Sequence, residues 1–249
     1  MSAAMGSGGT SPNVWVCLPT YNEGENLELM VARLLSVFAD AGVNGHVLVI
    51  DDASPDGTGA IADRLAEQAA PVRVLHRAEK QGLGPAYRDG FRVALANGAD
   101  LILEMDCDFS HDPGDVPRLV DAARNADLVL GSRYVPGGRV EDWFRRMFSR
   151  GGCAYARWTL GIEPRDLTGG FKCFRSDVLR SIPLDEVNSA GYVFQVEMTY
   201  RAIEQGYRIV EVPITFRDRA RGTSKMSKGI VLEAAVHVPR LKRQSKLTR

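Results

Sequence analysis

The 249-residue sequence lacks several features that define whole classes of protein. Its four cysteines are widely spaced and form no C-x-x-C pair, which argues against a disulfide framework or a zinc site. No run approaches the roughly 18–20 consecutive apolar residues that a membrane-spanning helix needs. Residues 1–12 show no basic stretch followed by an apolar one, so we expect no secretory signal. Together these absences favour a protein of the cytoplasm.

Two common nucleotide-binding motifs are also missing. The glycine-rich segment 80–84 (Lys-Gln-Gly-Leu-Gly) precedes a predicted helix. It matches neither the G-x-G-x-x-G dinucleotide fingerprint nor the P-loop pattern. This argues against a dehydrogenase or a P-loop NTPase, and it leaves nucleotide binding by other residues open.

Charged residues are unevenly distributed along the chain. The formal net charge is zero, whereas residues 217–249 hold ten Lys/Arg and two acidic residues. A basic end on an acidic body indicates an anionic partner such as phosphate groups, anionic lipid or nucleic acid, with a solvated basic tail as the alternative. No aromatic residue follows Phe216 among these basic residues. Because stacking carries much single-strand recognition, we expect no nucleic-acid partner.

Short apolar runs alternate with helical patterns along the first half of the chain. This alternation predicts a Rossmann-like α/β fold, with a mostly parallel central sheet flanked by helices in a single domain. We expect strands at 13–18, 46–50, 72–76, 101–105, 127–132, 170–174 and 207–216. We expect helices at 25–40, 58–69, 84–97, 140–159, 176–182, 193–205 and 229–238, and one opened by Pro113.

Acidic residues follow three of the predicted strands. Glu23 follows the first, Asp51 and Asp52 the second, and Asp106-x-Asp108 the fourth. Parallel strands bring their carboxyl ends to one edge of the sheet, where ligands bind. Carboxylates gathered there raise one another's pKa unless a cation compensates, and a hard divalent ion with oxygen ligands does so. A turn or capping role is the alternative for any single Asp.

Eight motifs occur in order over residues 13–229. They are Pro19-Thr20-Tyr21-Asn22-Glu23, Asp51-Asp52-x-Ser54-Pro55-Asp56-Gly57-Thr58, Gly82-Leu83-Gly84-x-Ala86-Tyr87, Asp106-x-Asp108-x-Ser110-His111, Gly131-Ser132-Arg133-Tyr134, Thr168-Gly169-Gly170-Phe171, Gly191-Tyr192-x-Phe194-Gln195-x-Glu197 and Arg219-x-x-Gly222-x-Ser224-Lys225-Met226. This series resembles the dolichol- or polyprenyl-phosphate mannose synthases, which are family 2 glycosyltransferases of GT-A fold. The resemblance implies a disordered tail at 1–12, a glycosyltransferase domain at 13–228 and a basic C-terminal helix or tail at 229–249.

The resemblance also implies an activity, which is inverting transfer of mannose from GDP-mannose to a polyprenyl phosphate, with Mg²⁺ or Mn²⁺ as cofactor. It implies metal ligation by Asp106, Asp108 and Ser110. The nucleotide-sugar contacts that it implies are Pro19, Tyr21, Glu23, Ile50, Asp52, Asp106, Cys107, Asp108, Arg133, Arg219 and Lys225. Catalytic roles fall on Asp108, Arg133, Arg219 and Lys225, and the acceptor side on Thr168, Gln195 and Glu197.

These residue types suit that reaction. The acceptor phosphate is already ionised, so a dedicated general base is dispensable. Charge that builds on the departing diphosphate is what needs stabilising, and a divalent ion with Arg and Lys side chains provides this. The loop that holds Arg219 and Lys225 also contains Gly222, and closure of this loop over the donor is a further expectation.

A lipid acceptor implies a membrane surface as partner. The predicted helix at 140–159 and its flank carry aromatic and apolar residues beside basic ones, as interfacial helices do: Arg139, Trp143, Phe144, Arg145, Arg146, Met147, Phe148 and Arg150. Packing of the aromatic residues on the sheet is the alternative. We expect peripheral association with the inner face of the cytoplasmic membrane, with a separate anchoring subunit as a further partner.

Two other functions fit the same sequence. Another donor, such as UDP-glucose, would use the same fold and the same lipid acceptor, because no motif here fixes base or sugar selectivity. A catalytically weak membrane-surface binding module is the alternative outside the enzymes. The intact Asp106-x-Asp108 pair and the basic residues Arg219 and Lys225 argue against that module.

Overall fold

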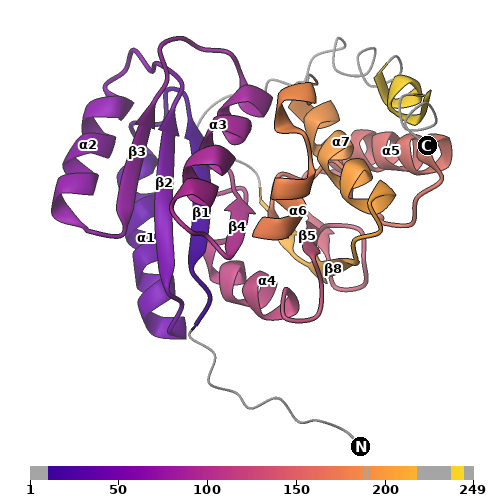
Figure 1. The fold of residues 1–249 in the computed structure, drawn as a ribbon, viewed down its shortest axis with the longest axis horizontal. Coiled ribbons are helices and arrows are strands. Elements are labelled where there is room, and N and C mark those ends of the chain that lie inside the picture. The colour runs from indigo at the N-terminus through magenta and orange to yellow at the C-terminus, as the bar shows by residue number, and fades with distance from the viewer. Residues whose placement is uncertain (1–10, 188, 190, 218–236, 244–249) are drawn as a thin grey trace, which may run out of the picture.

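A seven-stranded sheet organises the chain, in the strand order β3-β2-β1-β4-β7-β5-β8 (Figure 1). The computed structural model describes residues 11–187, 189, 191–217 and 237–243. The strands of this sheet are β1 (Val14–Thr20), β2 (Gly45–Asp51), β3 (Val72–His76), β4 (Leu101–Glu104), β5 (Leu128–Ser132), β7 (Lys172–Arg175) and β8 (Ile209–Pro213). β7 runs antiparallel to both β4 and β5, whereas the other neighbouring strands pair in parallel. The predicted mostly parallel α/β sheet is therefore confirmed.

Helices cover both faces of the sheet (Figure 1). They are α1 (Leu27–Ala41), α2 (Thr58–Gln68), α3 (Leu83–Ala96), α4 (Val116–Ala122), α5 (Trp143–Leu160), α6 (Ser176–Ser181) and α7 (Gly191–Glu204), with 3₁₀ turns at Pro113–Asp115 and Leu184–Glu186. Side chains alternate between the faces of a strand. In β1, Val14 and Val16 therefore join the core beneath α1, α2 and α4, whereas Trp15 and Cys17 join the core beneath α3, α6 and α7.

The predicted strand at 207–216 divides into two. β8 ends at Pro213, which has no N–H to donate to a neighbouring strand. The chain then forms β9 (Thr215–Phe216), which pairs in parallel with β6 (Arg139–Val140) as a separate two-stranded sheet. This small sheet carries the chain from β8 toward the carboxyl edge of the large sheet, where the nitrogen of Arg217 donates to the Ser110 carbonyl at 3.0 Å.

The described C-terminal segment, residues 237–243, is helical and lies beside α5 (Figure 1). Val238 and Leu241 pack in one buried cluster with Cys153 of α5, and Lys242 Nζ donates to the Thr159 carbonyl at 2.6 Å. The predicted helix end before Pro239 is therefore wrong. Burial of apolar side chains on both sides of the proline stabilises the helix through that position.

Two ionisable side chains of opposite type are buried in the centre of the sheet. Glu104 of β4 is opposite Lys172 of β7, and both side chains are fully buried. Burial raises the pKa of Glu104 to about 7 and lowers that of Lys172 to about 8, although each charge partly offsets the shift of the other. Lys172 Nζ also donates to the Gln195 carbonyl at 2.6 Å and to the Thr199 hydroxyl at 2.9 Å. These bonds join the sheet to α7.

We expect Glu104→Gln to change how stability depends on pH. The Glu104 pKa is raised from 4.5 to about 7, so between these values the folded protein keeps a proton that the unfolded chain releases. The carboxyl therefore stabilises the fold below pH 4.5, and this contribution is lost as pH rises to about 7. Urea unfolding at several pH values should show a fall of a few kcal/mol in the wild type that the variant lacks.

The exposed Glu67 supplies the control for this measurement. Glu67→Gln should keep the pH dependence of the wild type. If Glu104→Gln and the wild type lose the same free energy of unfolding over this pH range, the assignment of the pH dependence to Glu104 is wrong.

Candidate active site

Three loops meet at the carboxyl edge of the sheet because β2, β1 and β4 are parallel neighbours. Pro19 lies at the end of β1, Asp52 directly follows β2, and Asp106 follows β4 by two residues. The topology therefore brings together the strand ends at which the sequence analysis placed its acidic groups. In open α/β sheets this edge is where ligands bind.

Backbone strain marks the same three loops. Asn22, Ala53 and Phe109 have φ values of 58°, 58° and 61°, and one of them lies in each loop. For Ala53 and Phe109 this left-handed conformation costs roughly 1–2 kcal/mol, whereas asparagine adopts it more readily. Strain of this kind persists where the surrounding structure holds it, and it clusters at active sites and ligand clamps. The strained loops thus mark a candidate site independently of their charge.

The loop after β4 presents oxygen atoms suited to a hard cation. Asp108 is buried, and its Oδ1 accepts from the Ser110 nitrogen at 3.0 Å, whereas a third of the Asp106 side chain is exposed. The buried Ser110 hydroxyl has no hydrogen-bond partner among the described residues. Two carboxylates and an orphaned hydroxyl form a donor set that fits Mg²⁺ or Mn²⁺.

No group of three or more His, Cys, Asp or Glu side chains in the described part of the chain is arranged to hold a metal ion by itself. A cation on Asp106 and Asp108 therefore needs further ligands. Oxygen atoms of a bound diphosphate and water molecules are the ligands that Mg²⁺ sites commonly use for this purpose. The geometry fits a cation that binds together with its substrate.

His111 supports this loop from the interior. Its Nδ1 lies 3.8 Å from Asp106 Oδ2, and its ring lies against those of Phe171 and Phe216. Burial lowers the pKa of His111 to about 4, so the imidazole is neutral at physiological pH. It adds no positive charge to the acidic edge, and its role there is packing and orientation.

Five of the predicted nucleotide contacts, at the ends of β1, β2 and β4, differ in how far their side chains are buried. Tyr21 is half-buried, with Lys80 Nζ 3.4 Å above the centre of its ring, and Glu23 Oε2 accepts from Asn26 at 2.8 Å. The side chains of Ile50 and Cys107 are buried in the core, so only their backbone atoms are available to a ligand. Pro19 is half-buried at the sheet edge.

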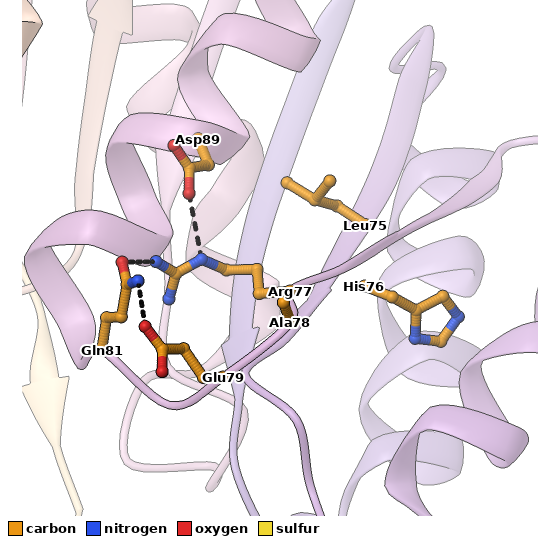
Figure 2. A pocket seen from close by; sticks show the side chains of 7 residues that line it. All are labelled: Leu75, His76, Arg77, Ala78, Glu79, Gln81 and Asp89. Atoms are coloured by element: carbon orange, nitrogen blue, oxygen red, sulfur yellow. Dashed lines mark hydrogen bonds and ion pairs between the residues drawn. The ribbon is translucent and has the colours of Figure 1, made fainter.

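A cavity of about 350 Å³ lies at the end of β3, beside the loop that joins this strand to α3 (Figure 2). It is lined by residues 75–79, Gln81 and Asp89. The Arg77 side chain crosses this region, with its guanidinium between Asp89 and Gln81 (Figure 2). Sequence reasoning missed Arg77, because a single Arg after a strand resembles an ordinary surface residue.

Arg133 is buried in a bidentate ion pair with Asp166. Its Nε and Nη2 donate to the two carboxylate oxygens at 2.7 Å each, and Nη2 also donates to the Thr168 hydroxyl at 2.9 Å. Glu211 fixes this loop by accepting from the nitrogens of Arg165 and Asp166 at 2.9 and 3.0 Å. The sequence analysis missed Asp166. Its position two residues before the Thr168-Gly169-Gly170-Phe171 motif is the signal that could have indicated it.

The three predicted acceptor-side residues lie in different environments. Thr168 belongs to the Arg133 cluster described above. Gln195 is buried. A Cβ atom added to Gly170 would lie 3.7 Å from Gln195 Nε2 and 3.7 Å from Asp106 Oδ1, so the Gln195 carboxamide lies near Asp106. Glu197 is bound by Ser189 and by Arg201, whose Nε donates at 2.8 Å. Their acceptor roles stay predictions.

Two predicted catalytic residues, Arg219 and Lys225, lie outside the described residues. The described chain nevertheless reaches the acidic edge just before them. Arg217 donates to the Ser110 carbonyl through its nitrogen, and its Nη1 lies 3.2 Å from Asp112 Oδ2. The roles of Arg219 and Lys225 stay predictions.

We expect Asp166→Ala to destabilise the protein by about 3–5 kcal/mol, because it leaves the Arg133 guanidinium buried without its partner. Asp121→Ala is the control, since its pair with Arg124 is about three-quarters exposed and is worth at most about 1 kcal/mol. Denaturant unfolding measures both changes in the free energy of unfolding. If Asp166→Ala and Asp121→Ala lower the free energy of unfolding by the same small amount, the Arg133–Asp166 pair does not stabilise the loop that contains Asp166.

The comparisons with known proteins agree with this geometry. The family model for glycosyl transferase family 2 matches residues 15–182. An undecaprenyl-phosphate mannosyltransferase from Micrococcus luteus is 52% identical over 229 residues, which cover 91% of this chain and 93% of the relative. A polyprenol monophosphomannose synthase from Mycolicibacterium smegmatis is 48% identical over 90% of this chain and 84% of its own length. The resemblance drawn from the motifs is confirmed.

Solved structures support the fold. A glucosyl-3-phosphoglycerate synthase from Mycobacterium tuberculosis, in complex with Mn²⁺ and UDP-glucose, superposes with a TM-score of 0.66 at 22% identity over 93% of this chain and 79% of that chain. A mannosyltransferase from Pyrobaculum calidifontis, in complex with GDP-mannose and Mn²⁺, superposes with a TM-score of 0.59 at 16% identity over 96% and 74%. At these identities the likeness establishes the GT-A architecture.

Proposed function

The chain belongs to glycosyl transferase family 2, and from this premise we propose that it transfers mannose from GDP-mannose to the phosphate of a polyprenyl phosphate, with GDP as the second product. Its relatives support the coarser activity, mannosyl transfer to a polyprenyl phosphate. GDP-mannose as donor and inversion at the anomeric carbon are the finer parts of the proposal. The observation that carries it is the Asp106–Ser110 loop, with its oxygen ligands at the carboxyl edge of β4.

Asp106, Asp108 and Ser110 would hold the divalent cation. Bound there, the ion would supply Lewis-acid stabilisation of the charge that develops on the departing diphosphate. Tyr21, Glu23 and Asp52 lie in the neighbouring loops, where we place the nucleotide together with Pro19 and the backbones of Ile50 and Cys107. The strained backbone of these loops holds the donor-binding groups in place before the donor arrives.

The acceptor phosphate needs no base to become a nucleophile, because it is ionised at neutral pH. This agrees with a neutral His111 beneath the loop, which is directed at Asp106 rather than outward. A single displacement by the phosphate oxygen inverts the anomeric carbon. The positioning of two polyanions against their mutual repulsion is then the main task of the protein.

Cationic side chains would perform this positioning. The contacts of Arg133 with Asp166 and Thr168 use Nε and Nη2, so Nη1 is the atom that we propose for a phosphate contact. Arg219 and Lys225, which follow the segment anchored at Ser110, complete the proposed set. Thr168, Gln195 and Glu197 are proposed for the acceptor side, with Gln195 nearest to Asp106.

The test is transfer of labelled sugar to polyprenyl phosphate from GDP-mannose and, in parallel, from UDP-glucose, with Mn²⁺, Mg²⁺ or a chelator. We expect metal-dependent labelling from GDP-mannose. Asp108→Asn should lower kcat by about a hundredfold or more, because it removes an anionic ligand from the cation. Asp121→Asn, which changes a carboxylate on α4 that is about three-quarters exposed, should retain activity.

Each other outcome has a distinct meaning. Labelling from UDP-glucose alone would overturn the donor assignment and keep the lipid acceptor. Full activity of Asp108→Asn would overturn the metal site. A folded, metal-loaded protein that labels no lipid from either donor would favour the membrane-surface binding module.

We further propose that α5 and the segment 237–243 face an anionic membrane surface. Trp158 on α5 is 82% exposed and Met147 is 48% exposed, an unusual exposure for large apolar side chains. Arg146 and Arg150 of α5 are exposed too, as are the neighbouring Arg240 and Arg243. Aromatic and apolar side chains beside basic ones suit the lipid interface.

Within the described residues, no helix has both the length and the apolar character needed to cross a bilayer. The side chains of Trp143, Phe144 and Phe148, which the sequence analysis singled out, are not among those described. We propose that the association is peripheral and on the cytoplasmic side. A separate anchoring subunit is a further part of this proposal.

We expect Trp158→Ala to weaken binding to vesicles that contain anionic phospholipid by about fivefold to tenfold, because a Trp side chain contributes much of the apolar area that an interfacial helix inserts. Leu29→Ala, which removes another exposed apolar side chain on α1, is the control and should bind as the wild type does. Co-sedimentation with the vesicles measures both. Equal binding of wild type and Trp158→Ala would remove α5 from the interface.

A further inference from the structure

The Arg77 guanidinium connects three parts of the candidate site, and Figure 2 shows two of these contacts, those with Asp89 and Gln81. Nη1 forms an ion pair with Asp52, which directly follows β2. Nε donates to Asp89 of α3 at 3.0 Å, and Nη2 donates to Gln81 of the loop between β3 and α3 at 2.8 Å. Only 7% of the Arg77 side chain is exposed. Such a buried guanidinium, in which each of the three nitrogens donates a hydrogen bond, is a built feature of the fold rather than a surface charge.

Asp52 is in turn bound by the loop that Arg77 begins. Its Oδ1 also accepts from the Gln81 nitrogen at 3.4 Å, and its Oδ2 accepts from the Gly82 nitrogen at 3.0 Å. Gly82 has a φ of 92°, a conformation that glycine adopts readily. A carboxylate has about four acceptor positions, and donors from the described residues occupy three of those on Asp52.

We propose that Arg77 is a positioning residue for the nucleotide end of the donor, acting through Asp52 and the loop 78–82. This inference rests on the proposed function, which places Asp52 in the donor site. Arg77 fixes the direction of the Asp52 carboxylate and holds the loop against β2, so the nucleotide meets a preformed surface. Preorganisation of this kind improves binding because little order is lost when the ligand arrives.

The fork geometry of the guanidinium is essential to this role. Three donors in one plane reach Asp52, Asp89 and Gln81 at the same time. A lysine ammonium is a point charge on a flexible stem and cannot hold three partners in that plane. Arg77→Lys therefore keeps the charge and removes the geometry.

Asp89 offers a matched pair of variants. Its Oδ2 binds Arg77 from inside, and its Oδ1 binds Arg92 Nη1 at 2.8 Å on the solvent side, where Arg92 is 43% exposed. Asp89→Asn weakens the hydrogen bond that positions Arg77. We do not place Asp89 itself in contact with the donor. Arg92→Gln breaks a bond to the same carboxylate and leaves Arg77 in place.

The experiment is calorimetric titration of the full chain with GDP and with UDP, in the presence of Mn²⁺, together with steady-state kinetics. We expect Arg77→Lys and Asp89→Asn to raise the dissociation constant for the bound nucleotide, and KM for the donor, by about tenfold, the scale of one charge-assisted hydrogen bond. kcat should stay within about threefold of the wild type, because the reacting atoms are untouched. Arg92→Gln should bind and react as the wild type does.

The outcomes separate this inference from the proposed function. Nucleotide binding that is equally tight in the wild type, Arg77→Lys and Asp89→Asn overturns the role of Arg77 and leaves the proposed function intact. A fall in kcat with unchanged KM also overturns it, since loss of folded protein acts in that way. A wild type that binds neither GDP nor UDP overturns the proposed function and this inference together.

Discussion

The parallel alignment of β2, β1 and β4 is the constraint on which the rest of the structure depends. It brings three loops to one edge, and each loop carries acidic side chains and one non-glycine residue in a left-handed conformation. Carboxylates concentrated in this way repel one another and repel any polyanionic substrate. The edge is therefore stable and useful only where cations compensate, which explains the ion pairs that surround it.

The arginines described around this edge serve first to hold the chain itself. Arg77 binds Asp52 and Asp89, Arg133 binds Asp166, and Arg217 binds Asp112. A guanidinium paired with a carboxylate contributes little net charge to a bound diphosphate. Under the proposed function, neutralisation of the substrate then falls mainly on the divalent cation and on Arg219 and Lys225, whereas the paired arginines fix positions.

Local patterns explain what the sequence could predict. The two-residue period of strands and the 3.6-residue period of helices can be recognised from residues that are close in sequence. The parallel sheet and the acidic strand ends were therefore predicted correctly. The antiparallel insertion of β7 between β4 and β5 was not, because strand order depends on pairing between distant segments. Arg77 and Asp166 were missed for a related reason. A single charged residue becomes informative only when the fold buries it beside a partner from elsewhere in the chain.

Helix α5 joins the proposed lipid surface to the proposed site. On its buried side, Cys153 Sγ lies 3.4 Å from the Thr168 hydroxyl, which also accepts from Arg133. Trp158 follows five residues later, which turns it roughly 140° around the helix, and it is exposed. One helix thus contacts the proposed acceptor-side residue Thr168 with one face and solvent with the other. Under the proposed function, a phosphate carried on a lipid approaches from the membrane. A helix with one face at the proposed site and the other at the proposed lipid surface would then let the acceptor reach the site while its chain stays in the bilayer.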